Sequence, residues 1–584
     1  MEIRAHPLAG DDCILGCGNM SVAIHYHPEA YTTSGPKLMG RNAAGESFLR
    51  AFLEHTQLSD DEPLWVQLAQ NEHLQTFQAL AKAYGRHNSI KAISNRNFTE
   101  LEKARTLYLP GPGLSEAAYH RRLIGDDRWS LCGITHTTSS AGAMDSIASL
   151  ITSPIQPWDA LICTSVAVKK NVEVILQAQA NELKERLGAT KLVLPKLPII
   201  PLGIHTADFA YTEDDRTKSR TELRVSEDTL VVLYAGRLSF HAKAHPLTMY
   251  QALEEAALTT GKDVLLIECG WHANKHIQEA FSQASSETCP SVRVMHLDGR
   301  ESANRDLAWS AADVFCSLSD NIQETFGIVP IEAMAAGLPV IVTDWDGYKD
   351  SVRDGVDGFR IPTMAPSPGL AGDLALRHAV GIDSYDMYCG YASSLVSINM
   401  TRLISAFVQL FSSSSLRLKM GDAGRARAQG NYDWKVIIDK YELLWSELAQ
   451  IRLTAQTYTS SELRNLEQPS TAQSGNNKWA ARLDPTIGFE NYPTQHLSFK
   501  TKLIRRDVSI EEAIYRYNKY KQLSMVSFAN YIFPTDKELR SVLTAATKYP
   551  QPAERLLTEI SSERMPYVLR SLSFLCKICV LEFI

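Results

Sequence analysis

The 584-residue sequence lacks the features of several special protein classes. Its ten cysteines follow no regular spacing, which excludes the disulfide framework of a small secreted domain. Cys576 and Cys579 form a Cys-x-x-Cys, but no second such pair accompanies them, so we expect core thiols rather than a metal or redox site. The chain opens without a basic segment followed by an apolar one, which predicts a cytoplasmic protein that is not exported.

Positive charge and long apolar runs are also scarce. The net charge is -7 and the pI is near 6.2, which argues against a broad nucleic-acid-binding surface. Pro566 to Ile584 is apolar, but Arg570, Lys577 and Glu582 interrupt it, so we expect a buried terminal helix. Peripheral attachment to a membrane stays open. The remaining composition, 45% hydrophobic and 21% charged, is that of an ordinary soluble globular protein.

Strand-like and helix-like stretches alternate along most of the chain, which is typical of a doubly wound α/β protein. At this length we expect three or four structural units. Predicted strands of a first series are Ser21–Tyr26, Leu64–Leu68, Arg105–Leu109, Trp129–Thr135 and Ala160–Thr164. Predicted strands of a second series are Thr229–Tyr234, Asp263–Glu268, Val292–Leu297, Asp313–Leu318 and Pro339–Thr343.

The most informative stretch runs from Glu324 to Gly337 and predicts a turn followed by a helix. Gly327 allows a close backbone approach, and Pro330 is tolerated in a first helical turn. Gly337 and Pro339 then end the helix.

A helix that starts at the carboxyl end of a parallel strand is an anion site, because free amides and the macrodipole favour a phosphate there. Glu324 lies in the loop before this helix, and Glu332 lies on its first turns. A phosphate between two carboxylates that bind hydroxyl groups matches the outline of a nucleotide-sugar. The alternative is an ordinary capped helix with two solvated glutamates.

These residues resemble the signature of the retaining family 4 glycosyltransferases of GT-B fold. The signature is Glu-x7-Glu within Phe-Gly-Ile-Val-Pro-Ile-Glu-Ala-Met-Ala-Ala-Gly-Leu-Pro-Val, and Asp354 to Phe359 matches the next loop of the family. The resemblance implies that Glu324 contacts hydroxyls of the donor sugar, that amides of Thr325, Phe326, Gly327 and Ile328 hold the diphosphate, and that Glu332 binds the ribose. One departure is Asp344 to Tyr348, where the family often has a Gly-Gly pair.

Two cations follow the predicted strand Thr229–Tyr234. Arg237 lies beside Gly236, and Lys243 comes six residues later. Positioned cations of this kind can neutralise the charge that accumulates on a leaving diphosphate. Alone, the pair is also compatible with solvated surface cations, but the resemblance assigns Gly236, Arg237 and Lys243 to the diphosphate.

The N-terminal half supplies weaker candidates. Gly40 to Gly45 opens a predicted helix, and the resemblance makes Gly45 part of a glycine loop that faces the diphosphate from the other domain. His136 follows a predicted strand, where open α/β sheets bind ligands. A lone histidine is more often structural, but the family commonly places one beside the donor sugar. The nucleobase is expected near Val294 to Gly299.

The resemblance implies an α/β GT-B fold of two Rossmann-like domains facing across a cleft, followed by a mainly α-helical C-terminal domain. A loose similarity at Leu202 to His205 places the first boundary there, and Asp433-Trp434 opens a helix, through Leu448, that crosses back to the first domain. The predicted parts are an N-terminal acceptor-side domain, 1–205, a nucleotide-sugar-binding domain, 206–454, a Ser-, Thr- and Asn-rich linker, 455–495, and a helical accessory domain, 496–584.

The sequence therefore predicts a retaining hexosyltransferase of glycan or glycoconjugate biosynthesis, with a nucleotide-diphosphate sugar as donor and His136, Glu324, Arg237 and Lys243 in catalytic roles. No cofactor and no metal is expected, because cations and helix dipole take the metal's role. The acceptor, a carbohydrate, a lipid-linked molecule or a small molecule, stays open. The role of the accessory domain also stays open, since it can select an acceptor, mediate oligomerisation or dock a partner. Competing readings are a non-catalytic nucleotide-sugar-binding scaffold and a GT-B phosphorylase or epimerase.

Overall fold

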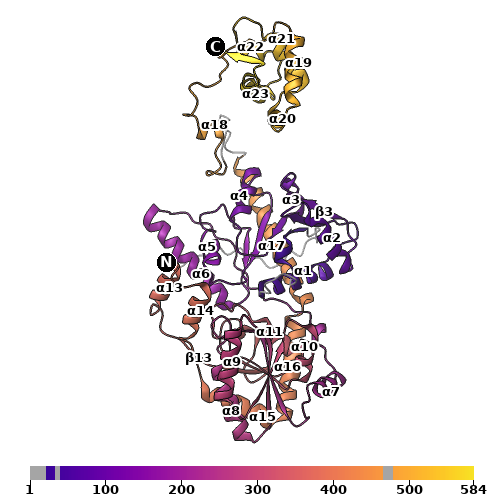
Figure 1. Cartoon of the computed structure of the whole chain (residues 1–584), viewed down its shortest axis with the longest axis vertical. Helices are drawn as coiled ribbons and strands as arrows, with labels where there is room; N and C mark the ends of the chain where they lie inside the picture. The colour runs from indigo at the N-terminus through magenta and orange to yellow at the C-terminus, as the bar shows by residue number, and fades with distance from the viewer. Residues whose placement is uncertain (1–20, 33–39, 464–477) are drawn as a thin grey trace. The chain divides into compact units, whose positions relative to one another are not determined.

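A computed structural model describes residues 21–32, 40–463 and 478–584. The chain divides into two compact units, residues 1–473 and 474–584, and each is described by itself. The first unit consists of two lobes, each built on a six-stranded sheet with helices on both faces (Figure 1). The GT-B architecture expected from the sequence is thus confirmed.

The first lobe holds a parallel sheet with the strand order β3-β2-β1-β4-β5-β6. Its order reverses between β1 and β4, and this switch point is where open α/β sheets bind ligands. The strands are β1 (Val22–Tyr26), β2 (Leu64–Leu68), β3 (Ile90–Ile93), β4 (Thr106–Tyr108), β5 (Ser130–Ile134) and β6 (Ala160–Ile162). The helices are α1 (Gly40–His55), α2 (His73–Ala83), α3 (Leu101–Ala104), α4 (Ser115–Ile124), α5 (Ala141–Ala148) and α6 (Val166–Leu187).

The second lobe repeats this plan with the order β12-β11-β10-β7-β8-β9, so that its switch point lies between β7 and β10. The strands are β7 (Leu230–Leu238), β8 (Val264–His272), β9 (Arg293–Asp298), β10 (Val314–Ser317), β11 (Val340–Thr343) and β12 (Gly358–Ile361). The helices are α7 (Glu213–Glu222), α8 (Leu247–Thr260), α9 (Lys275–Thr288), α10 (Ser302–Ala311), α11 (Ile328–Ala335), α12 (Tyr348–Ser351), α15 (Met400–Ser412) and α16 (Ser414–Asn431). An insertion between β12 and α15 adds β13 (Thr363–Met364), α13 (Gly372–Ala379), α14 (Tyr385–Ser393) and β14 (Ser397–Ile398).

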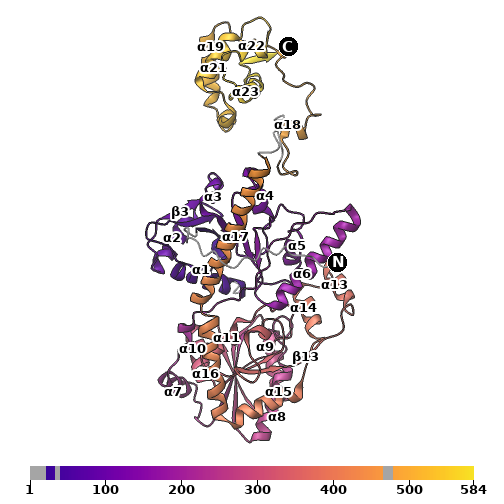
Figure 2. The same cartoon turned by 180° about the vertical axis from the view of Figure 1, so that it is seen from behind.

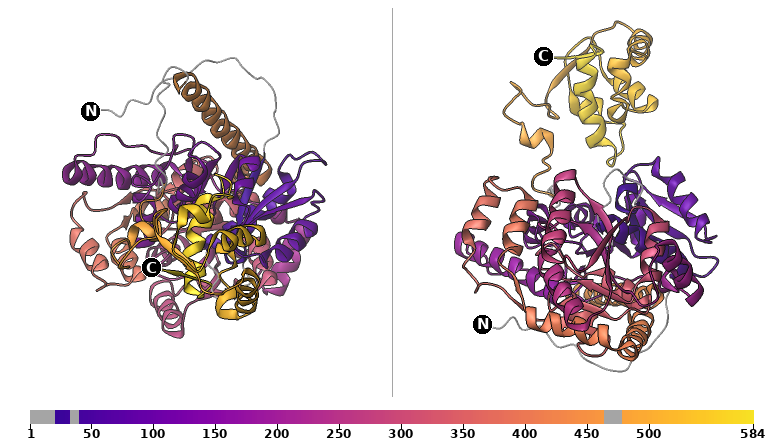
Figure 3. Two further views of the ribbon diagram at one scale, coloured as in Figure 1. Left: turned by 90° about the horizontal axis from the view of Figure 1, so that it is seen from above. Right: turned by 60° about the horizontal axis from the view of Figure 1, so that its bottom comes forward.

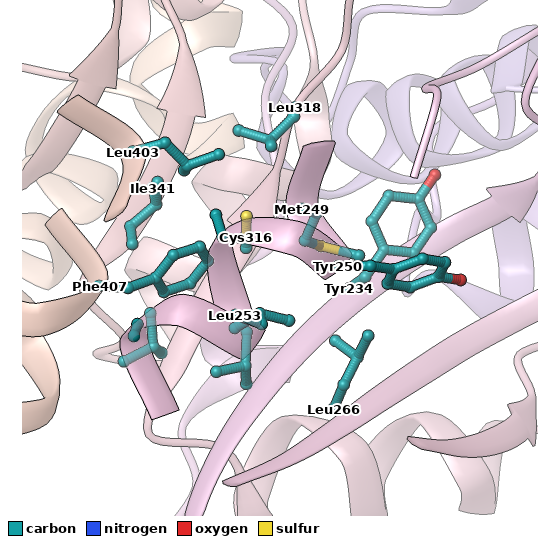
Figure 4. Packing of buried hydrophobic residues seen from close by; sticks show 14 of the residues in the cluster. Tyr234, Met249, Tyr250, Leu253, Leu266, Cys316, Leu318, Ile341, Leu403 and Phe407 are labelled. Carbon is teal, nitrogen blue, oxygen red and sulfur yellow. The ribbon is translucent and has the colours of Figure 1, made fainter. Parts of the chain in front are cut away.

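The central strands are mostly apolar because helices cover both faces of each sheet. In the second lobe, α8 and α15 pack on one face, where Leu253, Leu266, Ile341 and Phe407 are fully buried (Figure 4). This core fixes β7 and β10 side by side. The ends of these two strands carry most of the predicted site.

Helix α17 (Trp434–Leu463) returns from the second lobe to the first, as the resemblance implied (Figures 2 and 3). Trp434, Tyr441 and Trp445 pack into the core of the first lobe. The helix continues into the segment for which composition predicted a linker. Gln456, within that segment, donates to the carbonyl oxygen of Asp127 at 2.8 Å, and buried Arg452 just before it donates to the same oxygen. These contacts anchor the helix to the first lobe and explain the difference.

The C-terminal unit is mainly helical, as predicted, with a small antiparallel sheet of order β16-β15-β17 that the pattern did not indicate. Its elements are α18 (Pro485–Gly488), β15 (Lys502–Arg505), α19 (Ile510–Lys521), α20 (Ser524–Ser527), α21 (Asp536–Ala545), β16 (Gln551–Pro552), α22 (Ala553–Leu556), α23 (Met565–Lys577) and β17 (Leu581–Phe583).

The apolar segment at the end of the sequence forms α23, which buries Val568, Leu572 and Leu575 in the core of this unit. This confirms the expected buried helix. The core-thiol expectation holds only in part: Cys576 is half-buried, and Cys579 is exposed beyond the end of α23. Across the described residues, no helix combines the length and apolarity that crossing a membrane requires.

Candidate functional site

The predicted site residues of the second lobe meet at its switch point. Gly236 and Arg237 end the long strand β7, and Glu324 to Gly327 connect the neighbouring strand β10 to α11. In open α/β sheets, the chains that leave the two strands of a switch point diverge to opposite sides of the sheet. The topology therefore places the cations and the carboxylate opposite one another.

An ion pair joins the segment that follows β7 to the segment that follows β10. The Lys243 Nζ lies 2.5 Å from the Glu324 Oε2, although the two residues are far apart in sequence. Their side chains are 24% and 11% exposed, so the pair is partly withdrawn from water while staying accessible. Such a pair binds an anion when the lysine exchanges its carboxylate partner for the incoming phosphate.

Arg237 faces the same loop rather than bulk solvent. Its guanidinium donates to the carbonyl oxygen of Ala242 at 2.6 Å and to the Gln323 Oε1 at 2.8 Å. The backbone amide of Gln323 in turn donates to the Asn321 Oδ1 at 2.9 Å, and the Asn321 amide donates to the carbonyl oxygen of His241 at 3.1 Å. Gln323 and Asn321 thus hold the arginine against the loop. The sequence reasoning missed both, and the polar run between a buried strand and a helix was the signal that could have indicated them.

Two glycines shape the backbone here. Gly327 precedes α11 with a φ of +76°, and a Cβ atom at this position would lie 1.8 Å from the Tyr348 ring. Gly236 has a φ of +142° at the end of β7. Phe326 is buried to 1% exposure, so its side chain belongs to the core and only its backbone can face a ligand. The first turn of α11 presents amides that lack intrahelical partners.

Glu332 lies on α11. Burial raises its pKa to about 7, and the nearby cations Arg305 and Lys243 counteract part of this rise. Arg305, on α10, also donates to the carbonyl oxygen of Gly299 at 2.9 Å. The carboxyl group therefore titrates near neutral pH, between the predicted phosphate and nucleobase regions.

The first lobe reaches this loop through His136, which follows β5. The Thr325 hydroxyl donates to the carbonyl oxygen of His136 at 2.8 Å, so the histidine lies beside the loop that begins α11. Gly45 is placed differently: it is enclosed within α1, where a Cβ atom would lie 2.0 Å from the carbonyl oxygen of Ala30. Packing of α1 against this backbone accounts for the glycine, and its predicted contact with a diphosphate stays a prediction.

The segment that departs from the family pattern connects the two lobes. The side chain of Asp346, which has a φ of +39°, accepts from the Ser165 hydroxyl at 2.9 Å, and Asp350 accepts from the backbone amide of Val166 at 2.7 Å. Both acceptors satisfy the N-terminus of α6, which belongs to the first lobe. Burial raises the pKa of Asp346 to about 7. The departure therefore has a structural consequence, an additional contact between the lobes.

A surface depression of about 320 Å³ lies beyond the carboxyl ends of β8 and β9. The His272 and His296 rings lie 4.7 Å apart in it, and burial lowers the pKa of His272. Its lining residues are Trp271, His272, Asn274, Lys275, Gln278, His296, Asp298 and Arg300. Arg300 binds the Asp298 carboxylate at 2.6 Å and holds the pKa of that group down at about 2. The range predicted to face a nucleobase runs along this depression.

Two sheets of identical strand order, connected by a returning helix, define the class of GT-B proteins. Within that class, residues 215–367 match the family model for glycosyl transferases group 1.

The comparisons with individual proteins cover less of each sequence. The chain is 26% identical over 240 residues to a D-inositol 3-phosphate glycosyltransferase of Nocardia farcinica, covering 40% of this chain and 51% of that protein. It is 31% identical over 150 residues to a phosphatidyl-myo-inositol mannosyltransferase of Mycobacterium leprae, covering 26% and 30%. The chain thus spans about half the length, or less, of these two curated relatives.

Among solved structures, the Anabaena protein Alr3699/HepE in complex with UDP is 15% identical and gives a TM-score of 0.48 over 73% of this chain and 100% of that one. The lipopolysaccharide biosynthesis glycosyltransferase WaaG is 13% identical and gives a TM-score of 0.41 over 72% and 99%.

Proposed function

We propose that this protein is a retaining glycosyltransferase that moves a sugar from a nucleotide-diphosphate sugar to an acceptor. The observation that carries the proposal is the Lys243–Glu324 ion pair, with Arg237 held beside it, at the N-terminus of α11. These groups combine two cations with a helix dipole at a switch point. That combination suits a diphosphate more than a neutral ligand.

The proposed roles follow from the positions. Arg237, Lys243 and the amides of Thr325 to Ile328 would stabilise the negative charge that develops on the leaving diphosphate. A phosphate that binds Lys243 would replace Glu324 as its partner. Glu324 would then accept hydrogen bonds from hydroxyls of the donor sugar. Glu332 would accept from the ribose. Because the protein's own cations neutralise the diphosphate, the reaction as proposed requires no metal.

His136 comes from the other lobe and would hydrogen-bond the sugar or orient the acceptor. The backbone contact between His136 and Thr325 supports this role, since it keeps the first lobe against the donor loop. Lobes held together around the donor would exclude water, which protects the reacting sugar from hydrolysis.

The depression lined by His272 and His296 would hold the nucleobase. It lies at the ends of β8 and β9, next to β7 in the sheet, so a nucleotide could extend from α11 along the strand ends. A planar base can stack on the aromatic rings and form hydrogen bonds with the backbone atoms.

The experiment is a panel of nucleotide sugars, with release of nucleoside diphosphate as the readout. The acceptor panel should include inositol phosphates, because relatives are named for that acceptor class. We expect release of nucleoside diphosphate that depends on the acceptor. Lys243→Ala should lower the turnover more than it lowers the affinity for the donor. The anomeric configuration of the product, determined by NMR, tests retention.

Each competing function predicts a different result. Binding of nucleotide sugar without turnover for any acceptor would favour a scaffold. Turnover with inorganic phosphate and no nucleotide would favour a phosphorylase, and conversion of the donor without an acceptor would favour an epimerase. Lys103→Ala is a matched control, because this exposed lysine also pairs with a glutamate, Glu100 at 2.7 Å, in the first lobe and outside the donor loop.

A further inference from the structure

A separate cluster of potential metal ligands lies where the first lobe connects to the second. Glu54 and His55 end α1, and His205 lies in the connection between the lobes, directly before the short helix Thr206–Phe209. One ligand atom from each of the three residues lies within 4.8 Å of the other two. None of these residues belongs to the donor site described above.

The distances within the cluster suit coordination better than hydrogen bonding. The Glu54 Oε2 lies 3.8 Å from the His55 Nε2 and 3.7 Å from the His205 Nδ1. Both distances are too long for hydrogen bonds. They approach the separation of about 3.4 Å between neighbouring ligand atoms around a tetrahedral zinc ion with bonds of about 2.0–2.2 Å.

The hydrogen bond at the other side of the His205 ring orients this ligand. Its Nε2 lies 3.2 Å from the carbonyl oxygen of Ser47, which can only accept, so Nε2 carries the proton. In the neutral ring the Nδ1 lone pair then points toward the Glu54 carboxylate. Metal-bound histidines are typically oriented in this way by a backbone carbonyl on the second nitrogen.

The charges around the cluster offset one another in part. Arg50 donates to the Glu54 Oε1 at 3.1 Å, and it also binds Asp208 at 2.7 Å, so one guanidinium is shared by two carboxylates. The Oε2 of Glu54, which faces the histidines, is not the oxygen that binds Arg50. The cluster also lies at the C-terminal end of α1, where the helix dipole favours positive charge.

We propose that Glu54, His55 and His205 bind a zinc ion, with water as the fourth ligand. Two imidazoles and one carboxylate form a donor set that suits zinc and excludes magnesium and calcium, which prefer oxygen ligands alone. The ion would tie the end of α1 to the connection between the lobes. Thr206 in this connection already binds the Asp433 carboxylate, beside the start of α17, so the metal would stiffen the region where the chain passes between the lobes.

The test uses the full chain without an affinity tag, stripped with a chelator and titrated with zinc chloride in a calorimeter. We expect one equivalent of zinc to bind to the wild type, and its affinity to fall at least about tenfold in each of Glu54→Gln, His55→Gln and His205→Gln. The result is read as a difference from the wild type, because free thiols elsewhere on the chain can also bind zinc.

His378→Gln is the control. The His378 ring stacks on Tyr388 at 4.7 Å, and within the described residues it belongs to no group of three potential metal ligands. Zinc affinity should therefore be unchanged in His378→Gln. Equal affinity in the wild type and in all three cluster variants, or no zinc binding to the wild type, would overturn the proposal.

A second measurement does not depend on how well His205→Gln folds. Zinc should raise the thermal unfolding temperature of the wild type, because a ligand that binds the folded state stabilises it. The shift should be lost in His55→Gln, whose side chain lies at a helix end and is 30% exposed. A zinc-dependent shift of equal size in His55→Gln would show that the stabilising ion binds elsewhere.

Discussion

The two lobes of the first unit share a strand order, yet only one of them carries the charged site. Each sheet reverses its order between the first and fourth strand of its series, so each has a switch point where a ligand can bind. The second lobe places Arg237, Lys243 and Glu324 there, whereas the first lobe contributes His136 and the packed Gly45. Topology thus determines where a site can form, and the side chains determine which lobe uses it.

One buried acid from each lobe illustrates two ways of accommodating such a group. In the first lobe, Asp159 forms two hydrogen bonds to the Arg121 guanidinium, at 2.6 and 2.7 Å, and both residues are fully buried. In the second lobe, Glu268 accepts from the Tyr250 hydroxyl and has no cation beside it. Burial consequently raises the pKa of Glu268 to about 7.

The largest expected effect is a loss of activity after a substitution at the switch point of the second lobe. Glu324→Gln should reduce donor turnover by about 10² to 10³, because it removes a charge placed beside the reacting groups. Release of nucleoside diphosphate is the measurement. Glu182→Gln, at an exposed glutamate that pairs with Arg186 on α6, is the control and should retain activity. Similar losses in the two variants would indicate a general effect of surface charge instead.

Each lobe contains a crowded glycine, and replacing it by alanine allows the stability of the two lobes to be compared. Gly327→Ala combines a positive φ with a clash against the Tyr348 ring, and Gly45→Ala clashes with the carbonyl oxygen of Ala30. Each should lower the free energy of unfolding by about 2–4 kcal/mol, measured by calorimetry or denaturant titration. In the fraction that stays folded, only Gly327→Ala should weaken donor binding. Loss of donor binding in folded Gly45→Ala would instead favour the predicted contact with the diphosphate.

Glu332→Gln should weaken donor binding by about 1.5–3 kcal/mol, the usual contribution of a hydrogen bond to a charged group. Since the pKa of Glu332 is about 7, its carboxylate form increases as the pH rises from 6 to 8. Donor affinity of the wild type should therefore rise over this interval, and the Gln variant should lose that part of the dependence. Parallel pH profiles in titration calorimetry would refute the ribose role.

The smallest expected effect concerns stability and pH. The Glu268 carboxyl holds its proton up to about pH 7 in the folded protein, but only to about its usual value of 4.5 when unfolded. The folded state therefore binds more protons between these values, so the contribution of Glu268 to stability is present at low pH and is lost as the pH rises through 7. Glu268→Gln should flatten the fall in unfolding temperature between pH 5 and pH 8. An unchanged slope would assign the dependence to other groups.

Several elements could be predicted from the sequence because their signals are local. The helix after Glu324 begins and ends where Gly327 and Gly337 indicate, since positive φ angles at both positions require glycine. Long apolar runs gave the central strands of both sheets to within a few residues. Two edge strands were missed: β3 is short, and β12 begins inside the segment interpreted as a loop.

The sequence by itself determined the class of fold, the position of helix α11 and the types of charged residue near it. Only the tertiary structure decided that Lys243 contacts Glu324, that Gln323 and Asn321 hold Arg237, and that Gly45 serves packing. The physical reason is the distance along the chain over which each signal acts. Glycine conformations and hydrophobic periodicity act over a few residues and can be recognised along the chain, whereas these contacts join segments that meet only after the parallel sheet has brought distant strand ends together.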